Sequence, residues 1–186
     1  MSRKGSAYEP KGKLLMAEDE LFNYVMGQIR VGREYERYVA DQLIVAGVPA
    51  VVGQEGVTET RTEQEWREFK DERDILVAGR WRLEVKSRTF SFTGVADHPF
   101  DSTIVSTVRS WENKAEKPVA VAIVSQPTRA IVVVPASTRM YWEKRERPDR
   151  KRGYAVLNYE CPVELLKPWD DLVSWFKDRL DEMRER

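Results

Sequence analysis

Hydrophobic positions along the chain follow two spacings, one typical of helices and one typical of strands. Residues 14–30 carry apolar side chains at helical spacing, and a similar stripe through residues 164–183 predicts a helix that faces the core or a second subunit. Residues 49–52 form a short apolar run that predicts a strand. Residues 118–125 and 130–135 are almost continuously apolar, which is typical of strands buried on both faces.

A β-hairpin is predicted within residues 74–86. Residues 74–78 and 81–86 are typical of strands, and Gly79 with the arginine after it forms a two-residue connection. Because side chains alternate along a strand, three apolar residues of the second strand face one way, and Glu84 and Lys86 face the other.

Four further segments complete the pattern. The alternation over residues 89–93 predicts a continued or third strand, and Asp101 is placed to cap a helix that ends near Lys114. Residues 137–152 are the most basic stretch, and residues 153–159 predict an edge strand.

The order of these elements predicts the fold class. Helix, strand, hairpin, helix, two strands and helix together indicate an α/β sandwich with a mixed central sheet. The length of 186 residues fits one such domain. We expect an N-terminal arm and helix over residues 1–31, followed by the main domain over residues 32–186.

Composition narrows the setting of the protein. The 31 basic and 31 acidic residues give a net charge of zero, so a nucleic-acid surface would require local segregation of charge. The single cysteine, Cys161, excludes an internal disulfide and offers no zinc-site spacing. No apolar run has the length of a membrane span and no signal peptide is evident, so we expect a cytoplasmic protein that does not bind membranes.

The hairpin carries the candidate chemistry. Asp74, Glu84 and Lys86 are placed to converge, and two carboxylates beside an ammonium suit a divalent cation and a nearby phosphate. The alternative is a surface hairpin on which Glu84 and Lys86 form a simple ion pair.

This pattern resembles the core of the PD-(D/E)XK nuclease superfamily, in which an aspartate enters one strand and Glu-x-Lys lies in the next. Here the residues are Asp74 and Glu84-Val85-Lys86, and Arg73 stands where many members have proline. The resemblance covers roughly residues 32–125 and implies a restriction-endonuclease-like fold. It also implies that Asp74 and Glu84 bind Mg²⁺, with Mn²⁺ as a substitute, and that Lys86 assists the attacking water.

A third acid is predicted in residues 32–47. Glu36 lies on the helical stripe of Val39, Ala40 and Leu43, which must pack inward, whereas Glu34 lies on another side. The alternative is a first-turn glutamate favoured by the helix dipole. The segment resembles the first helix of the same superfamily, and this implies that Glu36 completes the metal site.

Candidate DNA contacts lie outside the hairpin triad. Arg88, Arg109 and Lys114 are expected near the site, and the basic segment could contact a DNA backbone or form a solvated helix. The basic residues proposed there for DNA binding are Arg145, Arg147, Arg150 and Lys151. The only histidine, His98, is either a general base or a solvated loop residue.

We therefore expect a Mg²⁺-dependent DNA endonuclease or exonuclease that hydrolyses phosphodiester bonds, with DNA as its partner and possible assembly as a homodimer. Two alternatives stay open. The same fold could serve as a non-catalytic DNA-binding module, or as a subunit of a larger nuclease complex.

Overall fold

The computed structural model describes residues 18–53, 75–149 and 154–185. A six-stranded sheet has the order β1-β2-β3-β5-β6-β9, and a three-stranded sheet has the order β4-β8-β7. The elements are α1 (Glu18–Val45), β1 (Ala50–Val52), β2 (Ile75–Val77), β3 (Trp81–Arg88), β4 (Ser102–Thr107), α3 (Val108–Glu112), β5 (Ala120–Ser125), β6 (Ile131–Pro135), the 3₁₀ helix η3 (Ala136–Tyr141), β7 (Glu143–Asp149), β8 (Tyr154–Pro162), the 3₁₀ helix η4 (Val163–Leu165), β9 (Lys167–Pro168) and α4 (Trp169–Arg184).

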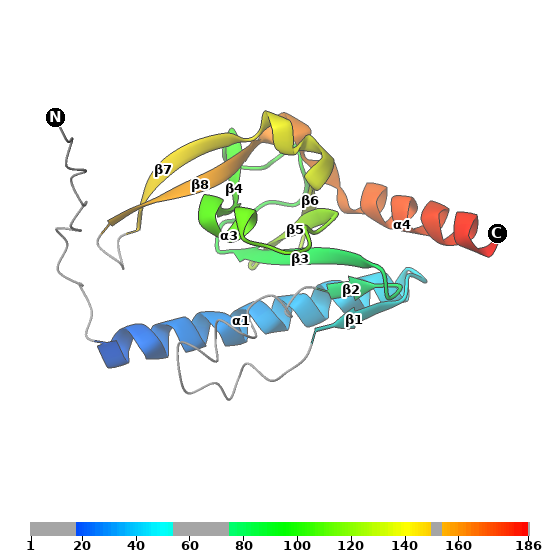
Figure 1. Cartoon of the computed structure of the whole chain (residues 1–186), viewed down its shortest axis with the longest axis horizontal. Coiled ribbons are helices and arrows are strands. Elements are labelled where there is room, and N and C mark those ends of the chain that lie inside the picture. Colours follow the sequence, from blue (N-terminus) through cyan, green and yellow to red (C-terminus); the bar gives the residue numbers. More distant parts are fainter. Residues whose placement is uncertain (1–17, 54–74, 150–153, 186) are drawn as a thin grey trace, which may run out of the picture.

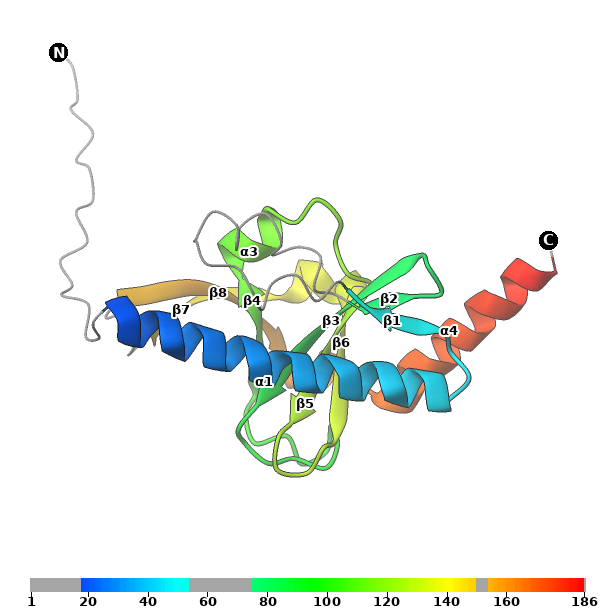
Figure 2. The same cartoon turned by 90° about the horizontal axis from the view of Figure 1, so that it is seen from below.

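The larger sheet is mixed, because β3 and β5 run parallel while its other neighbouring strands are antiparallel. Helix α1 lies along one side of this sheet, and the smaller sheet with α3 lies on the other (Figure 1). Seen from below, α1 crosses the strands of the larger sheet (Figure 2). The predicted α/β class with a mixed sheet is confirmed.

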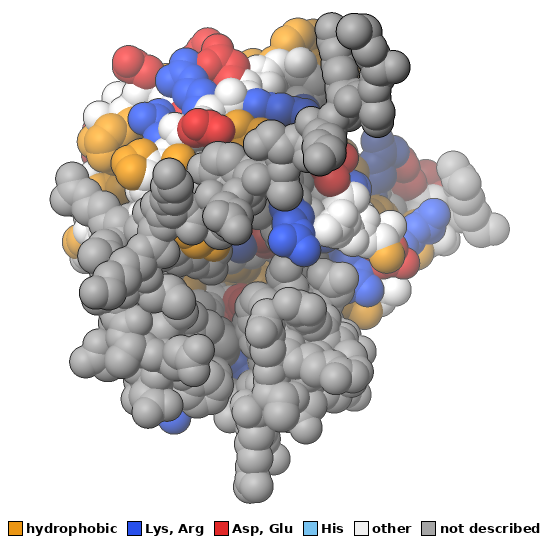
Figure 3. Space-filling view, turned by 60° about the vertical axis from the view of Figure 1, so that its left-hand side comes forward, with side chains coloured by type: hydrophobic (Ala, Val, Ile, Leu, Met, Phe, Trp, Pro, Cys, Tyr) orange, Lys and Arg blue, Asp and Glu red, His pale blue; other side chains and the backbone are white. Residues whose placement is uncertain are grey.

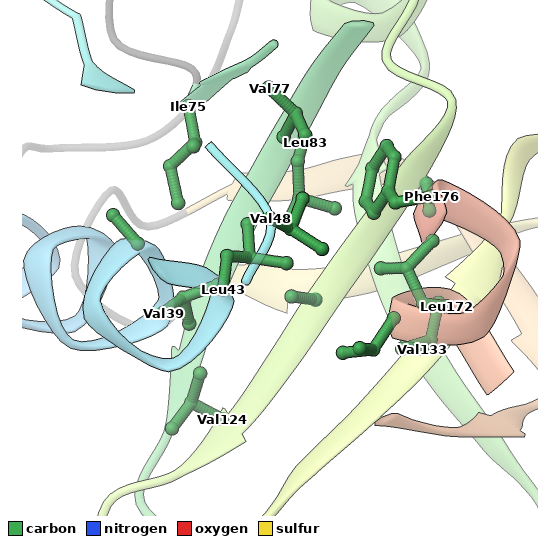
Figure 4. Close-up of a cluster of buried hydrophobic side chains, with 14 of the residues drawn as sticks. Val39, Leu43, Val48, Ile75, Val77, Leu83, Val124, Val133, Leu172 and Phe176 are labelled. Atoms are coloured by element: carbon green, nitrogen blue, oxygen red, sulfur yellow. The ribbon is translucent and has the colours of Figure 1, made fainter. Parts of the chain in front are cut away.

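Two hydrophobic cores share the larger sheet. Side chains of α1 and α4 meet Leu83, Ala122 and Val124 in the first core, part of which is drawn in Figure 4. Val121 and Ile123 face the second core, together with residues of the smaller sheet. Successive β5 side chains therefore enter different cores, which explains why this strand is apolar throughout and confirms its predicted burial on both faces.

The predicted hairpin is present, but its connection is one residue longer than expected. Strand β2 ends at Val77, and residues 78–80 form the turn. Ala78 and Gly79 have φ angles of 50° and 67°, as a type I′ turn requires at its two central residues. The amide of Arg80 donates to the carbonyl of Val77 at 3.0 Å. The sequence pattern assigns Ala78 to the strand, but its positive φ places it in the turn, and the predicted connection is therefore one residue too short.

Helix α1 is continuous through residues 30–32, so the expectation of a separate helix ending at Arg30 is wrong. Neither proline nor a capping group interrupts the chain there, and a helix tolerates Gly32 at a cost of about 1 kcal/mol. The helix ends where Gly47 adopts φ 84° and Val48 donates its amide to the Leu43 carbonyl at 2.8 Å. The boundary proposed between residues 31 and 32 therefore falls inside one helix.

Residues 101–114 do not form the single helix that the sequence predicts. The β-branched run in β4 pairs with β8, and only the short helix α3 follows. Thr107, rather than Asp101, caps that helix by accepting a hydrogen bond from the Ser110 amide at 3.0 Å. The strand predicted over residues 89–93 is also absent, because the alternating phenylalanines there pack into an aromatic cluster instead.

The C-terminal half differs from the sequence prediction in two strands. Strand β8 is the middle strand of its sheet rather than an edge, since β4 and β7 pair with its two sides. The described part of the basic segment forms η3 and β7 rather than a solvated helix. Arg150 and Lys151 lie outside the described residues.

Helix α4 begins at Trp169, within residues 164–183 where the sequence predicts a helix, and the predicted apolar stripe packs into the first core through Leu172, Val173 and Phe176. Within the described part of the chain, no helix combines the length and apolar character needed to cross a membrane.

Two leucines on neighbouring strands test the first core. Leu83 on β3 is fully buried, whereas Leu76 on β2 is 39% exposed. Leu83→Ala should lower the free energy of unfolding by about 2–5 kcal/mol, because it removes buried methyl groups and leaves a cavity. Leu76→Ala, the matched control, should cost much less. Urea unfolding of both variants measures the difference, and equal losses would contradict the assignment of the core face of β3.

Candidate functional site

The polar face of β3 forms the centre of the candidate site. Glu84 is 5% exposed, and its backbone pairs in parallel register with Val121, a residue of the second core. Leu83, one residue earlier, faces the first core. The predicted alternation along this strand is confirmed, and it places a carboxylate inside the protein beside apolar side chains.

Two lysines offset the charge of this carboxylate. The Lys86 Nζ lies 2.7 Å from Glu84 Oε1, and the Lys114 Nζ lies 3.7 Å from Glu84 Oε2. The Lys114 side chain is only 9% exposed, whereas that of Lys86 is 37% exposed. One ammonium group is therefore buried with the carboxylate, and the other reaches the surface.

The pKa of Glu84 reflects a balance between burial and these two cations. Burial acts to raise the pKa, but the charges of Lys86 and Lys114 act against it, and the net result is a pKa below the usual glutamate value. Glu84 is therefore ionised at neutral pH. Its Oε2 atom is buried and accepts no hydrogen bond from the described residues, and the nearest cation to it is the Lys114 ammonium at 3.7 Å.

Asp74, the other acid of the predicted hairpin triad, lies outside the described residues. The residue that follows it, Ile75, pairs with Leu83 across the hairpin. The first described residue of β2, Ile75, therefore lies beside Leu83, the residue before Glu84.

Glu36 lies on α1, which packs on the opposite face of the sheet from Glu84. Glu36 is half-buried on the inward stripe, whereas Glu34 is exposed, in agreement with the predicted helix phase. Glu34 forms an ion pair with Arg129 Nη2 at 2.6 Å. Beyond Leu83, no strand of the described residues pairs with β3 on its β2 side.

Arg88 continues the polar face of β3 beyond Lys86. Its Nη2 donates to the Ile104 carbonyl, and this bond ties β3 to β4 of the smaller sheet. Burial lowers the pKa of Arg88, and the nearby charge of Glu84 opposes that effect. Arg88 is therefore engaged with protein groups at the junction of the two sheets.

The other predicted DNA contacts are distributed differently. Arg109 is exposed on α3, while Arg145 and Arg147 on β7 bind acidic side chains. In the view of Figure 3, the described Lys and Arg side chains are interspersed with Asp and Glu, so the surface there is mixed rather than uniformly basic.

Glu160, a buried acid of the smaller sheet, is not among the residues that the sequence predicts for the site. Glu160 is 1% exposed, and it accepts hydrogen bonds from Arg147 and from Ser102. The predicted strand ends at Tyr159, three residues before the observed end of β8 at Pro162. Extending the alternation from Asn158 to Glu160 would have placed this acid on the same face as Asn158.

His98 has a structural environment rather than the solvated one that the sequence suggests. Its ring packs against Phe90, Phe92 and Phe100, with ring centroids 5.4–6.2 Å apart, and its Nδ1 lies 3.0 Å from the Phe100 carbonyl oxygen. None of the described contacts joins it to Glu84 or Lys86. Its role in this arrangement is to order the loop between β3 and β4.

Comparison with known proteins adds no assignment to this geometry. The chain matches no family model, no curated protein and no solved structure.

Lys114 is predicted to stabilise the fold through the charge of Glu84. Lys114→Met keeps much of the side-chain volume but removes the buried cation, so it should cost about 1–3 kcal/mol near neutral pH. The stability contributed by the lowered pKa of Glu84 is present above the unfolded-state pKa and is lost as the pH falls through the folded-state value. Lys114→Met raises that folded-state pKa. The deficit of the variant should therefore shrink in acid.

Urea unfolding near neutral pH and at acidic pH measures this change. Lys177→Met on the exposed surface of α4 is the matched control and should have little effect at either pH. A Lys114→Met deficit that is the same at both pH values would contradict a charge interaction with Glu84.

Proposed function

We propose that this protein is a metal-dependent nuclease that hydrolyses phosphodiester bonds of DNA. The observation that carries the proposal is the pairing of Glu84 and Lys86 on one face of β3, at 2.7 Å, with Glu84 buried and ionised. This is the Glu-x-Lys half of the pattern that resembles the PD-(D/E)XK superfamily.

Glu84 offers an oxygen ligand that suits a hard divalent cation, but one carboxylate is not enough to hold the ion beside two lysines. Glu84 Oε2 is a buried carboxylate oxygen without a hydrogen bond from the described residues, which is the kind of ligand that Mg²⁺ and Mn²⁺ accept. Two ammonium groups outnumber this single carboxylate. The proposal therefore depends on Asp74 and Glu36, whose carboxylates would make the group of five side chains net anionic.

The side chains have separate roles in this proposal. Asp74, Glu84 and Glu36 would hold the metal, which when bound lowers the pKa of a water molecule and offsets charge on the phosphate. Lys86 is exposed enough to meet a substrate, and it positions the attacking water and stabilises the negative charge that develops on the phosphate oxygens. Water oxygen bonds to phosphorus and loses a proton to solvent, while the bond from phosphorus to the leaving oxygen breaks and that oxygen takes up a proton from solvent.

Lys114 would act through Glu84 rather than on the substrate. Its side chain is nearly buried, and its charge lowers the pKa of Glu84. A carboxylate kept ionised in a buried position remains available to a metal over a wider pH range. Lys114 is thus proposed as a positioning residue and not as the phosphate contact expected from the sequence.

Lys86→Ala should reduce DNA cleavage by about 100-fold or more while folding and DNA binding persist, because the lysine acts on the transition state. Asp74→Asn should also reduce cleavage, and part of its activity should return at high Mn²⁺ because the lesion lies in metal binding. The measurement is cleavage of linear, circular, branched and single-stranded DNA with Mg²⁺, Mn²⁺ or EDTA.

Lys177→Ala provides the matched control, since this lysine lies on the exposed side of α4. The Lys177→Ala variant should cleave DNA as the wild type does. Thermal melting checks that each variant is folded. Wild-type cleavage by Lys86→Ala would assign Glu84 and Lys86 to a structural ion pair, and the non-catalytic DNA-binding module would then be the better description.

A further inference from the structure

A cleft of about 650 Å³ opens where the end of β3 meets the smaller sheet. We call it the arginine cleft, and we define it by Arg88, Phe90, Phe100, Arg145, Arg147 and Glu160, all of which line it. It combines guanidinium groups from two sheets with aromatic rings from the loop between β3 and β4.

Arg147 is held in this cleft by a buried carboxylate. Its Nε lies 2.5 Å from Glu160 Oε1 and its Nη2 lies 2.8 Å from Glu160 Oε2, so the two groups form a bidentate pair. Ser102 Oγ donates a further hydrogen bond to Glu160 at 2.8 Å. The Arg147 side chain is nevertheless 48% exposed, although its Nε and Nη2 atoms are engaged by Glu160.

The cleft offers guanidinium groups to an anion. Its lining contains three arginines and two acids, Asp101 and Glu160, and Arg145 also forms an ion pair with Glu143 at 2.5 Å. Arg145 is 49% exposed, and its Nη1 lies 3.8 Å from Glu160 Oε2. A phosphodiester carries one negative charge and accepts the paired hydrogen bonds that a guanidinium donates.

The aromatic part of the cleft supplies a second kind of contact. Phe100 is 53% exposed, and its ring meets that of Phe90 edge to face with centroids 4.9 Å apart. The ring of Phe92, which is 1% exposed, packs against that of Phe90 with centroids 5.9 Å apart, and His98 contacts the Phe100 backbone. An exposed ring on a fixed base, beside cations, is the arrangement that stacks unpaired nucleic-acid bases.

Strand β3 links the cleft to the candidate site, because Arg88 lines the cleft. Arg88 lies two residues beyond Lys86 on the same face of β3, a distance of about 7 Å along a strand. A nucleic-acid strand that placed one phosphate at Lys86 would therefore pass into the arginine cleft within a few nucleotides.

From these observations we propose that the arginine cleft binds an unpaired stretch of the substrate strand, with a phosphate at Arg145 and Arg147 and a base stacked on Phe100. The cleft thereby selects DNA with a single-stranded segment over continuous duplex. This inference rests on the proposed nuclease function for its biological role, but the binding itself requires neither metal nor catalysis.

The test measures binding of a fluorescein-labelled oligothymidylate by fluorescence anisotropy in EDTA, alongside the same strand in duplex with oligodeoxyadenylate. The wild type should bind the single strand more tightly than the duplex. Phe100→Ala should weaken single-strand binding about tenfold and leave duplex binding little changed. Arg145→Gln should weaken single-strand binding and reduce the slope of log affinity against log salt by about 0.7 for each phosphate that the variant no longer neutralises.

Two control variants change exposed residues outside the cleft, and a second substitution of Phe100 guards against misfolding. Tyr141→Ala removes an exposed aromatic ring of η3 that does not line the cleft, and Arg179→Gln removes an exposed arginine of α4. Both should bind as the wild type does. Phe100→Leu keeps apolar bulk in the loop and should still lose the stacking contribution, so it replaces Phe100→Ala if that variant fails to fold.

Equal affinity of the wild type for both DNA forms, or unchanged binding by the cleft variants, would overturn the inference. Failure of the nuclease proposal gives a different result. In that case no wild-type cleavage occurs with Mg²⁺ or Mn²⁺, while the cleft variants still bind the single strand more weakly than the wild type.

Discussion

The burial of one ionised carboxylate in the six-stranded sheet is the constraint on which the candidate site depends. Moving a carboxylate out of water costs several kcal/mol unless cations and hydrogen bonds replace its hydration. Lys86 and Lys114 provide those cations for Glu84 from two different segments of the chain. Lys114 follows α3, and it pairs with Glu84 on β3. The placement of α3 is therefore linked to the placement of β3.

The larger sheet separates structural and chemical roles by the alternation of its side chains. On β3, Leu83 enters the first core with helices α1 and α4, while Glu84 and Lys86 face the smaller sheet. An ion group of this kind contributes little net stability compared with apolar residues of similar volume. The nuclease proposal gives a reason for placing these charged side chains on a strand between two apolar cores, because a metal site would need them there.

The local pattern of the sequence was sufficient for the parts of the fold that short-range physics determines. The alternation of β3, the two-sided burial of β5 and the inward phase of Glu36 against the exposed Glu34 all follow from residue spacing. Long-range pairing decided the parts that were predicted wrongly. Residues 104–111 have a helical apolar stripe, but β8 offers residues 102–107 strand partners that a single segment cannot reveal.

The same division between local pattern and long-range packing applies to the candidate site. The juxtaposition of Glu84 and Lys86 follows from a strand period of two, whereas the approach of Lys114 depends on how α3 packs. Glu160 was missed because its partner Arg147 is 13 residues away on another strand, and no local pattern couples them. Asp74, Arg150 and Lys151 lie outside the described residues, so their roles stay predictions.

Strand β7 is the outer strand of the three-stranded sheet, and its free side has no strand partner among the described residues. Unpaired strand edges invite other chains to add strands and aggregate. Charged side chains occupy most of β7, and Pro148 removes one backbone donor from it. The charged character of this strand therefore has a benefit independent of any ligand, since it keeps copies of the protein from polymerising edge to edge at high concentration.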